Sequence, residues 1–328
     1  MGMMPFFLGA PLPKGYDKFP KVITYHATFN IMLSEDVFPI GPGLPPPSTE
    51  EGRAQVAAMN AGTKAFFQAA CDYANPILRP LGTTKNMDDI FDFLMTAGDV
   101  TVLPYSPSLD YPRSDLHPQI RFIGLMPLRE LSSTFVTPPW LEEIKANAAL
   151  PAESPDKKKI VFVSQGTVAT NHEDLLLPTL KAFAGRSDLR IIATLGKRGK
   201  GVPEALKGYD NAIVTDYIPY DAVLPVTDVY ITNAGFGAFA HGVMNGVPMV
   251  MCGISQEKPE VCARAEMAGL AVNLRTQSPS VESLVDGVEK VLQNPSYKER
   301  ARQVKKENED MDPLGSVEQI VWELVKQG

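Results

Sequence analysis

The chain has 328 residues, of which 44% are hydrophobic and 21% charged, a composition typical of a folded globular protein and not of a disordered or fibrous one. The net charge of −7 argues against a nucleic-acid-binding surface, and no apolar run approaches the roughly 20 residues of a membrane-spanning helix. The three cysteines are too widely spaced for a disulfide framework or a metal-binding motif, and residues 1–12 lack the basic start of a secretory signal. These features predict an acidic, cytoplasmic protein of two domains.

The first 150 residues are rich in turns, and a proline-rich connector at 39–47 can continue neither a helix nor a strand ladder. The predicted elements of this part are three short strands and two helical stretches, over residues 21–25, 101–104, 120–124, 50–79 and 140–149. A polar, proline-containing segment follows at 151–159. It predicts a boundary between one domain at 1–150 and a second at 151–328.

From residue 160 onward, short apolar strands alternate with helices. The predicted strands are 160–163, 190–194, 212–214, 229–231, 249–251 and 271–274, and the helices between them include 175–184, 238–244 and 259–268. Fully apolar strands separated by helices are typical of a parallel sheet buried on both faces, so the sequence predicts a doubly wound α/β domain. Such sheets bind ligands at the carboxyl ends of their strands.

Three turns at predicted strand ends carry residues suited to ligand binding. The first contains Gly166 and Thr167, a glycine that permits close backbone approach and a hydroxyl that can bond to a phosphate or sugar oxygen. The second, 232–241, runs into a helix whose N-terminal amides favour an anion such as a diphosphate. The third, 253–260, is polar and charged. Taken alone, the first turn is better explained as a plain connection and the third as solvated surface, and the second is equally compatible with packing, but three of them in one sheet favour a shared site.

Other candidate motifs are weaker. The basic segment 197–200 is interpreted as a solvated loop. The chain contains no His-Glu-x-x-His or Cys-x-x-Cys zinc pattern, no Walker loop and no Gly-x-Ser-x-Gly elbow. We therefore expect neither a metal nor a resident cofactor.

Residues 232–250 resemble the signature of the family 1 glycosyltransferases, in which a Thr-His-x-Gly turn and a helix precede Gly-Val-Pro-Met/Leu-Val. Segments 163–167, 216–220 and 257–264 resemble three further motifs of that family, in the family's order. The similarity covers about residues 160–275 and is nearest to the fungal and bacterial branch that glycosylates small lipophilic molecules or sterols. It implies the GT-B fold, with two Rossmann-like lobes, of which the C-terminal one is complete and the N-terminal one truncated.

The resemblance implies a UDP-sugar site in the C-terminal lobe. Tyr217 would stack on uracil, the backbone of Ile218 would pair with the base edge, and Glu257 and Lys258 would face the sugar hydroxyls. The residues that would approach the diphosphate are Gly166, Thr167, Asn233, Gly235, Phe236, Gly237 and Ala238.

Three positions depart from the family pattern. Asn233 stands in place of a histidine, which keeps one hydrogen-bond donor and removes charge assistance. His241 stands in place of a glutamate that binds ribose, and an imidazole can still bond to a hydroxyl. Tyr220 replaces a glutamine.

The resemblance implies an acceptor site in residues 1–150, but the family's glycine-rich first turn and its histidine base are not found there. No catalytic residue is therefore assigned, and His26 is only a weak substitute for the base. The predicted activity is transfer of a hexosyl group from a UDP-sugar to a hydroxyl of a small lipophilic acceptor, such as a secondary metabolite or sterol, with inversion. The alternatives are a catalytically impaired nucleotide-sugar-binding remnant and an enzyme that epimerises the nucleotide sugar without an acceptor.

Overall fold

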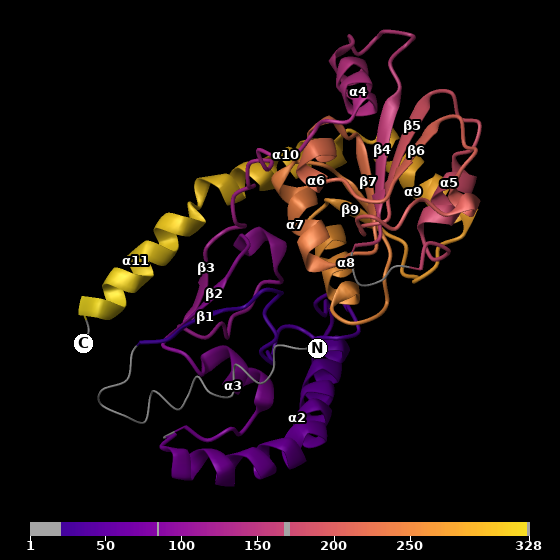
Figure 1. Cartoon of the computed structure of the whole chain (residues 1–328). Coiled ribbons are helices and arrows are strands. Elements are labelled where there is room, and N and C mark those ends of the chain that lie inside the picture. Colours follow the sequence, from indigo (N-terminus) through magenta and orange to yellow (C-terminus); the bar gives the residue numbers. More distant parts are fainter. Residues whose placement is uncertain (1–20, 84, 167–170, 327–328) are drawn as a thin grey trace. The chain divides into compact units, whose positions relative to one another are not determined.

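The computed structural model describes residues 21–83, 85–166 and 171–326 (Figure 1). These described residues divide into two compact units, one within 1–126 and 308–328 and the other within 127–307. Each unit has its own parallel sheet.

The first unit is built on a three-stranded parallel sheet in the order β1-β2-β3. Its elements are β1 (Ile23–Tyr25), α2 (Glu50–Leu78), the 3-10 turns Arg79–Leu81 and Pro107–Leu109, α3 (Ile90–Thr96), β2 (Val100–Leu103), β3 (Ile120–Phe122) and α11 (Pro313–Lys326). Thr49 and Asp89 begin the two helices α2 and α3, because the side chain of each accepts backbone N–H bonds from the first helical turn.

The C-terminal helix α11 belongs to this first unit. Ile320 and Leu324 on α11 pack in one buried cluster with Val102 and Ile123 of the small sheet. The division into units therefore differs from a single cut at residue 150, since the last helix returns to the N-terminal sheet and α4 (Pro139–Ala149) lies in the second unit.

The second unit contains a six-stranded, wholly parallel sheet in the order β6-β5-β4-β7-β8-β9. Its strands are β4 (Lys159–Ser164), β5 (Leu189–Thr194), β6 (Ala212–Thr215), β7 (Val229–Thr232), β8 (Met249–Met251) and β9 (Ala271–Asn273). All six strands expected from the sequence are present, as are the three expected in the first unit. The prediction of a doubly wound α/β domain is confirmed.

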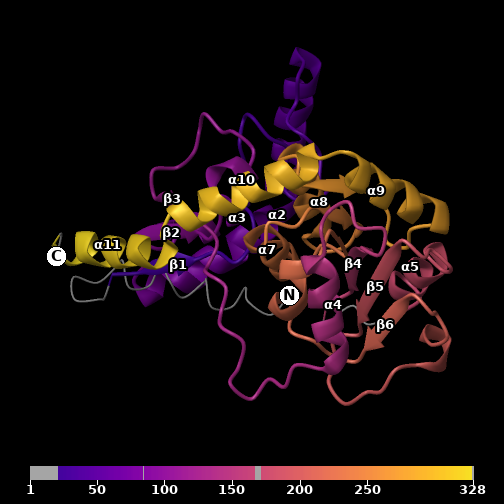
Figure 2. The same cartoon turned by 90° about the horizontal axis from the view of Figure 1, so that it is seen from above.

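Helices cover both faces of this sheet (Figures 1 and 2). The helices of the unit are α4, α5 (Leu176–Ala182), α6 (Tyr220–Val223), α7 (Phe236–Met244), α8 (Lys258–Met267), α9 (Val281–Gln293) and most of α10 (Ser296–Asp310), with 3-10 turns at Glu204–Leu206 and Leu224–Val226. Helices α5 and α9 pack on one face over a core of fully buried aliphatic side chains, and α6, α7 and α8 lie on the other. Right-handed crossovers produce this arrangement. From β4 to β6 the chain moves along the sheet in one direction and from β7 to β9 in the other, so a crossover of the same hand lies on opposite faces in the two halves.

Candidate functional site

The carboxyl ends of β4, β7 and β8 lie side by side. The strands are neighbours, with Ser164 paired to Thr232 and Thr232 paired to Met251 at their last residues. The three turns singled out in the sequence follow these residues directly, so the structure brings all three to one edge of the sheet.

The first two turns are joined by the side chain of Asn233. This residue is only 5% exposed, and its Nδ2 donates to the backbone oxygen of Gln165 at 2.5 Å. Gly166 has a φ of +76°, and a Cβ there would lie 3.9 Å from Asn233 Oδ1. Gln165 is fixed in turn, because its Nε2 donates to the Asn171 carbonyl at 2.6 Å. The Asn233 amide therefore stabilises the first turn through its hydrogen bond to Gln165, and it lies beside Gly166. Thr167 lies outside the described residues.

Among the described residues, no side chain caps the N-terminus of α7. Its N-cap is Gly235, with no side-chain capping bond, and the turn enters it through Ala234 at a φ of +63°. Among the residues that the structure describes, a Cβ at Gly235 or at Gly237 would meet no heavy atom within 4 Å outside its own neighbours along the chain, and neither glycine has a positive φ. Gly242 in the same helix is different, since a Cβ there would lie 2.6 Å from Met249 Sδ. Packing therefore requires glycine at 242, whereas no contact with a described residue requires it at 235 or 237.

The third turn packs against the second at Gly253. This glycine has a φ of +147°, and a Cβ there would lie 2.8 Å from both the Asn233 carbonyl oxygen and Lys258 Cδ. Lys258, the first residue of α8, is 6% exposed, and Glu257 before it is half-buried. The residues predicted to face the sugar are thus placed beside the predicted diphosphate turn.

Tyr217 lies just after β6, the edge strand of the sheet. Strands β5 and β4 separate β6 from β7, which leads into the second turn. The Arg198 guanidinium lies over the Tyr217 ring, 4.2 Å from the centroid. The backbone N–H of Gly199 donates to the Asp216 carboxylate at 2.6 Å and thereby ties the basic loop to this segment. The loop is exposed, as expected, but its contact with Tyr217 has no signal in the sequence. Ile218 is buried.

His241 is held by a carboxylate that the sequence did not single out. Its Nδ1 lies 2.8 Å from Asp221 Oδ1, which also accepts a bond from Asn245 Nδ2 at 2.9 Å. The ring packs edge-on against Tyr220, with 5.5 Å between centroids. Because the bond uses Nδ1 and the side chain is 41% exposed, the other ring nitrogen is the one open to a ligand. The only sequence signal for Asp221 is its place one residue after Tyr220.

Tyr220 connects this pair to the first turn. Its ring is within 6.0 Å of Tyr230, measured between centroids, and Tyr230 Oη lies 2.5 Å from Ser164 Oγ at the end of β4. Burial raises the pKa of Tyr220 above its usual value, partly offset by hydrogen bonds from Ser164 and Tyr230. The phenol is therefore a neutral structural group at physiological pH.

His26 is not suited to act as a base. It is buried, and burial lowers the pKa of its imidazole to about 4. A general base works best with a pKa near the working pH, so this group is too weak. No catalytic base is identified among the described residues.

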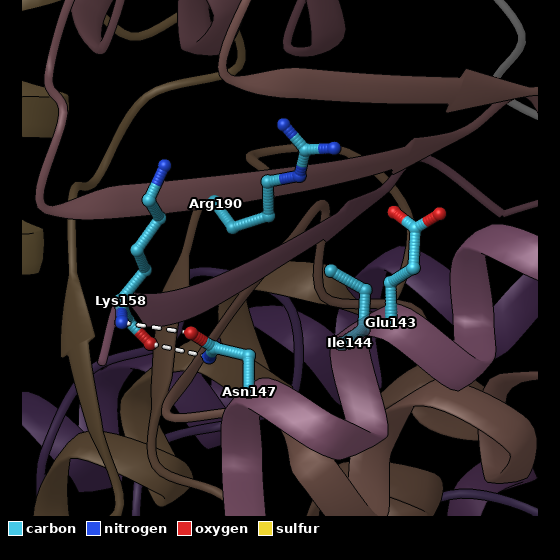
Figure 3. A pocket seen from close by; sticks show the side chains of 5 residues that line it. All are labelled: Glu143, Ile144, Asn147, Lys158 and Arg190. Atoms are coloured by element: carbon cyan, nitrogen blue, oxygen red, sulfur yellow. Dashed lines mark hydrogen bonds between the residues drawn. The ribbon is translucent and has the colours of Figure 1, made fainter. Parts of the chain in front are cut away.

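A pocket of about 220 Å³ lies elsewhere, near the amino ends of β4 and β5 (Figure 3). Figure 3 shows the Asn147 side chain paired with the backbone of Lys158, with Glu143 on α4 and Arg190 on β5 nearby. None of the predicted site residues lines it.

The described part of the chain has no helix both long and apolar enough to cross a bilayer. Within the same residues, no cluster of three or more His, Cys, Asp or Glu side chains could hold a metal ion.

Residues 83–322 match the family model described as UDP-glucoronosyl and UDP-glucosyl transferase. The chain is 40% identical to UDP-glucosyltransferase 1 of Beauveria bassiana, over 98% of this chain and 69% of that protein. It is 34% identical to UDP-glucosyltransferase B1 of Starmerella bombicola, over 99% and 70%.

Solved glycosyltransferases share the fold. The glycosyltransferase of kitacinnamycin aligns with a TM-score of 0.66 and 19% identity over 92% of this chain and 70% of its own. The calicheamicin glycosyltransferase CalG4 aligns with a TM-score of 0.62 and 18% identity over 78% and 61%. These likenesses identify the architecture as the GT-B type expected from the sequence.

Proposed function

The chain belongs to the UDP-glucoronosyl and UDP-glucosyl transferase family, and from this premise we propose that it transfers a hexosyl group from a UDP-sugar to a hydroxyl of a small lipophilic acceptor, with inversion at the anomeric carbon. Similarity to UDP-glucosyltransferases across almost the whole chain supports the transfer from a UDP-sugar. The resemblance to the branch that acts on small lipophilic molecules supports the nature of the acceptor.

The observation that carries the proposal is the N-terminus of α7, which no side chain of the described residues caps. Among the described residues nothing requires Gly237 to be glycine, although a helical glycine costs roughly 0.5–1 kcal/mol relative to alanine. A contact between a ligand and the backbone would explain it, because glycine lets a bulky anion reach the amides directly, whereas Gly235 is the N-cap, where glycine is itself common. The turns at Gly166 and Gly253 lie beside this segment: a Cβ at Gly166 would lie 3.9 Å from Asn233 Oδ1, and one at Gly253 would lie 2.8 Å from the Asn233 carbonyl oxygen.

We assign the remaining predicted residues to the uracil, ribose, diphosphate and sugar parts of the donor. We assign Tyr217 to stack on the uracil ring with the face opposite the Arg198 guanidinium, beside the buried Ile218, and His241 to offer its second ring nitrogen to a ribose hydroxyl. Residues assigned to the diphosphate are Gly166, Thr167, Asn233, Gly235, Phe236, Gly237 and Ala238, and those assigned to the sugar end are Glu257 and Lys258.

We assign no metal or resident cofactor to the reaction, and the UDP-sugar is a co-substrate. Amides at a helix N-terminus and a buried cation can offset diphosphate charge without a bound metal. A cytoplasmic location stays a prediction of the sequence.

Calorimetry with UDP tests the donor site, and micromolar to millimolar binding that does not require Mg²⁺ is expected. Absence of heat at millimolar UDP would refute the site. Incubation with UDP-glucose and a panel of lipophilic alcohols tests transfer, and the anomeric configuration of the product tests inversion.

The same incubations separate the alternatives. A binding remnant would bind UDP and give no product with any acceptor, whereas a sugar-nucleotide epimerase would alter UDP-glucose with no acceptor present.

A further inference from the structure

Lys258 is a buried cation. The residue is 6% exposed, and within the described part of the chain its ammonium has one hydrogen-bond contact, Ser255 Oγ at the long distance of 3.5 Å. Across the residues that the structure describes, no carboxylate forms an ion pair with it. The other buried cation of α8, Arg264, is different, since it lies 2.5 Å from the Glu260 carboxylate.

This placement destabilises the fold in two ways. Removing an ammonium from water without a paired charge is strongly unfavourable, and the single hydroxyl contact does not offset it. Lys258 is also the first residue of α8, where the helix dipole disfavours a positive charge. Stability therefore does not explain a lysine here, and an anionic ligand would.

The anion can be located from the packing around Gly253. The Lys258 stem and the Asn233 carbonyl oxygen both lie 2.8 Å from the position of a Gly253 Cβ, so the lysine runs alongside the turn that leads into α7. That turn carries no positive charge of its own, because Asn233 is neutral and its Nδ2 donates to the Gln165 carbonyl. The packing therefore places the stem of Lys258 against this turn, within reach of an anion bound there.

We propose that Lys258 binds the β-phosphate of the donor and stabilises the charge that develops on it, beyond any contact with sugar hydroxyls. The inference rests on the proposed glycosyl transfer. In that reaction the acceptor oxygen forms a bond to the sugar's C1 and releases its proton to solvent. The bond between C1 and the phosphate oxygen breaks with its electron pair left on the β-phosphate. UDP thus leaves with one additional negative charge, next to the ammonium.

The test compares Lys258→Met, which keeps the stem and removes the charge, with Lys258→Gln, which keeps a neutral hydrogen-bond donor. Lys290→Met, at an exposed site on α9, is the matched control. Calorimetry on the full chain gives affinities for uridine, UDP and UDP-glucose. We expect both Lys258 variants to bind UDP 10- to 100-fold more weakly, the scale of one lost charged hydrogen bond, with uridine affinity unchanged. Lys290→Met should match the wild type.

Thermal unfolding separates this role from a structural one, because replacing a lysine that stabilised the fold would lower the unfolding temperature. Without ligand, Lys258→Met should unfold at the wild-type temperature or above, since a buried unpaired charge has been removed. Unchanged UDP affinity, or equal weakening of uridine and UDP, would overturn the proposal.

Binding of UDP-glucuronate distinguishes the β-phosphate from another anion of a donor, the carboxylate of a sugar acid. A loss confined to UDP-glucuronate would assign the lysine to a sugar carboxylate and would also overturn the proposal. Failure of the wild type to bind UDP would instead refute the donor site itself, a distinguishable result.

Discussion

Replacing Gly237 by alanine should stabilise the protein and weaken its binding of UDP. Gly237 is the second residue of α7 and has no positive φ, and a methyl carbon added to it would meet no heavy atom of the described residues within 4 Å, its chain neighbours aside. The gain in helix propensity is therefore not offset by a clash, and we expect about 0.5–1 kcal/mol of added stability. In a unit of this size that raises the unfolding temperature by about 2 °C. The same methyl would hold the diphosphate away from the helix amides.

The expected loss of UDP affinity is at least tenfold, because one charge-assisted hydrogen bond is worth about 1.5–3 kcal/mol and about 1.4 kcal/mol is a factor of ten. Urea unfolding and calorimetry with UDP on the same preparation measure both effects. Gly242→Ala is the matched control in the same helix. Its methyl would meet Met249 Sδ at 2.6 Å, so it should lose stability and keep UDP affinity. A stabilised Gly237→Ala that binds UDP like the wild type would refute the reasoning.

Three further outcomes are expected. Tyr217→Ala should weaken the binding of uridine and of UDP equally, by about tenfold, because stacking on a base is worth about 1–3 kcal/mol. Tyr217→Phe should bind both normally, and a loss of affinity specific to UDP would exclude stacking. Asp221→Asn should release His241 and thereby weaken the binding of UDP about fivefold, and that of 2′-deoxy-UDP less. Equal losses of affinity for both nucleotides would contradict a ribose contact. His26 has a folded pKa of about 4 against 6.5 for a free imidazole, so between these values the unfolded chain alone takes up the proton. Stability should then fall by about 3 kcal/mol from pH 6.5 to pH 4 in urea titrations, and His26→Gln should flatten that slope.

The strands of the second unit were predictable because each is a short apolar run bounded by turns, and burial on both faces leaves little freedom in such a run. Val161, Ile191 and Ile231 are all fully buried, as that pattern requires. The adjacency of the three turns followed from the same pattern, since the carboxyl ends of parallel strands share one edge.

The return of α11 to the first unit was not predictable. Its apolar positions indicate a buried face but do not identify the partner, and Leu324 packs with Val102 across more than 200 residues of sequence. The same limit applies to Asp221 and His241, which lie on different helices and meet only because α6 and α7 cover one face of the sheet. Burial of Lys258 was not predictable either, because a charged residue in a turn is normally solvated.

The strained and costly features of the second unit gather at the edge where the donor is proposed to bind. In the described part of the second unit, the residues other than glycine with a positive φ are Ala234 and Gln256, in the second and third turns at +63° and +59°, and Arg275 after β9 at +52°. Gly237 lowers the helix propensity of α7, and Lys258 buries a charge at a helix start. Each of these features costs stability. Departures from local preference that cluster at one place are expected where a ligand compensates them, so the location of the site has support independent of any family resemblance.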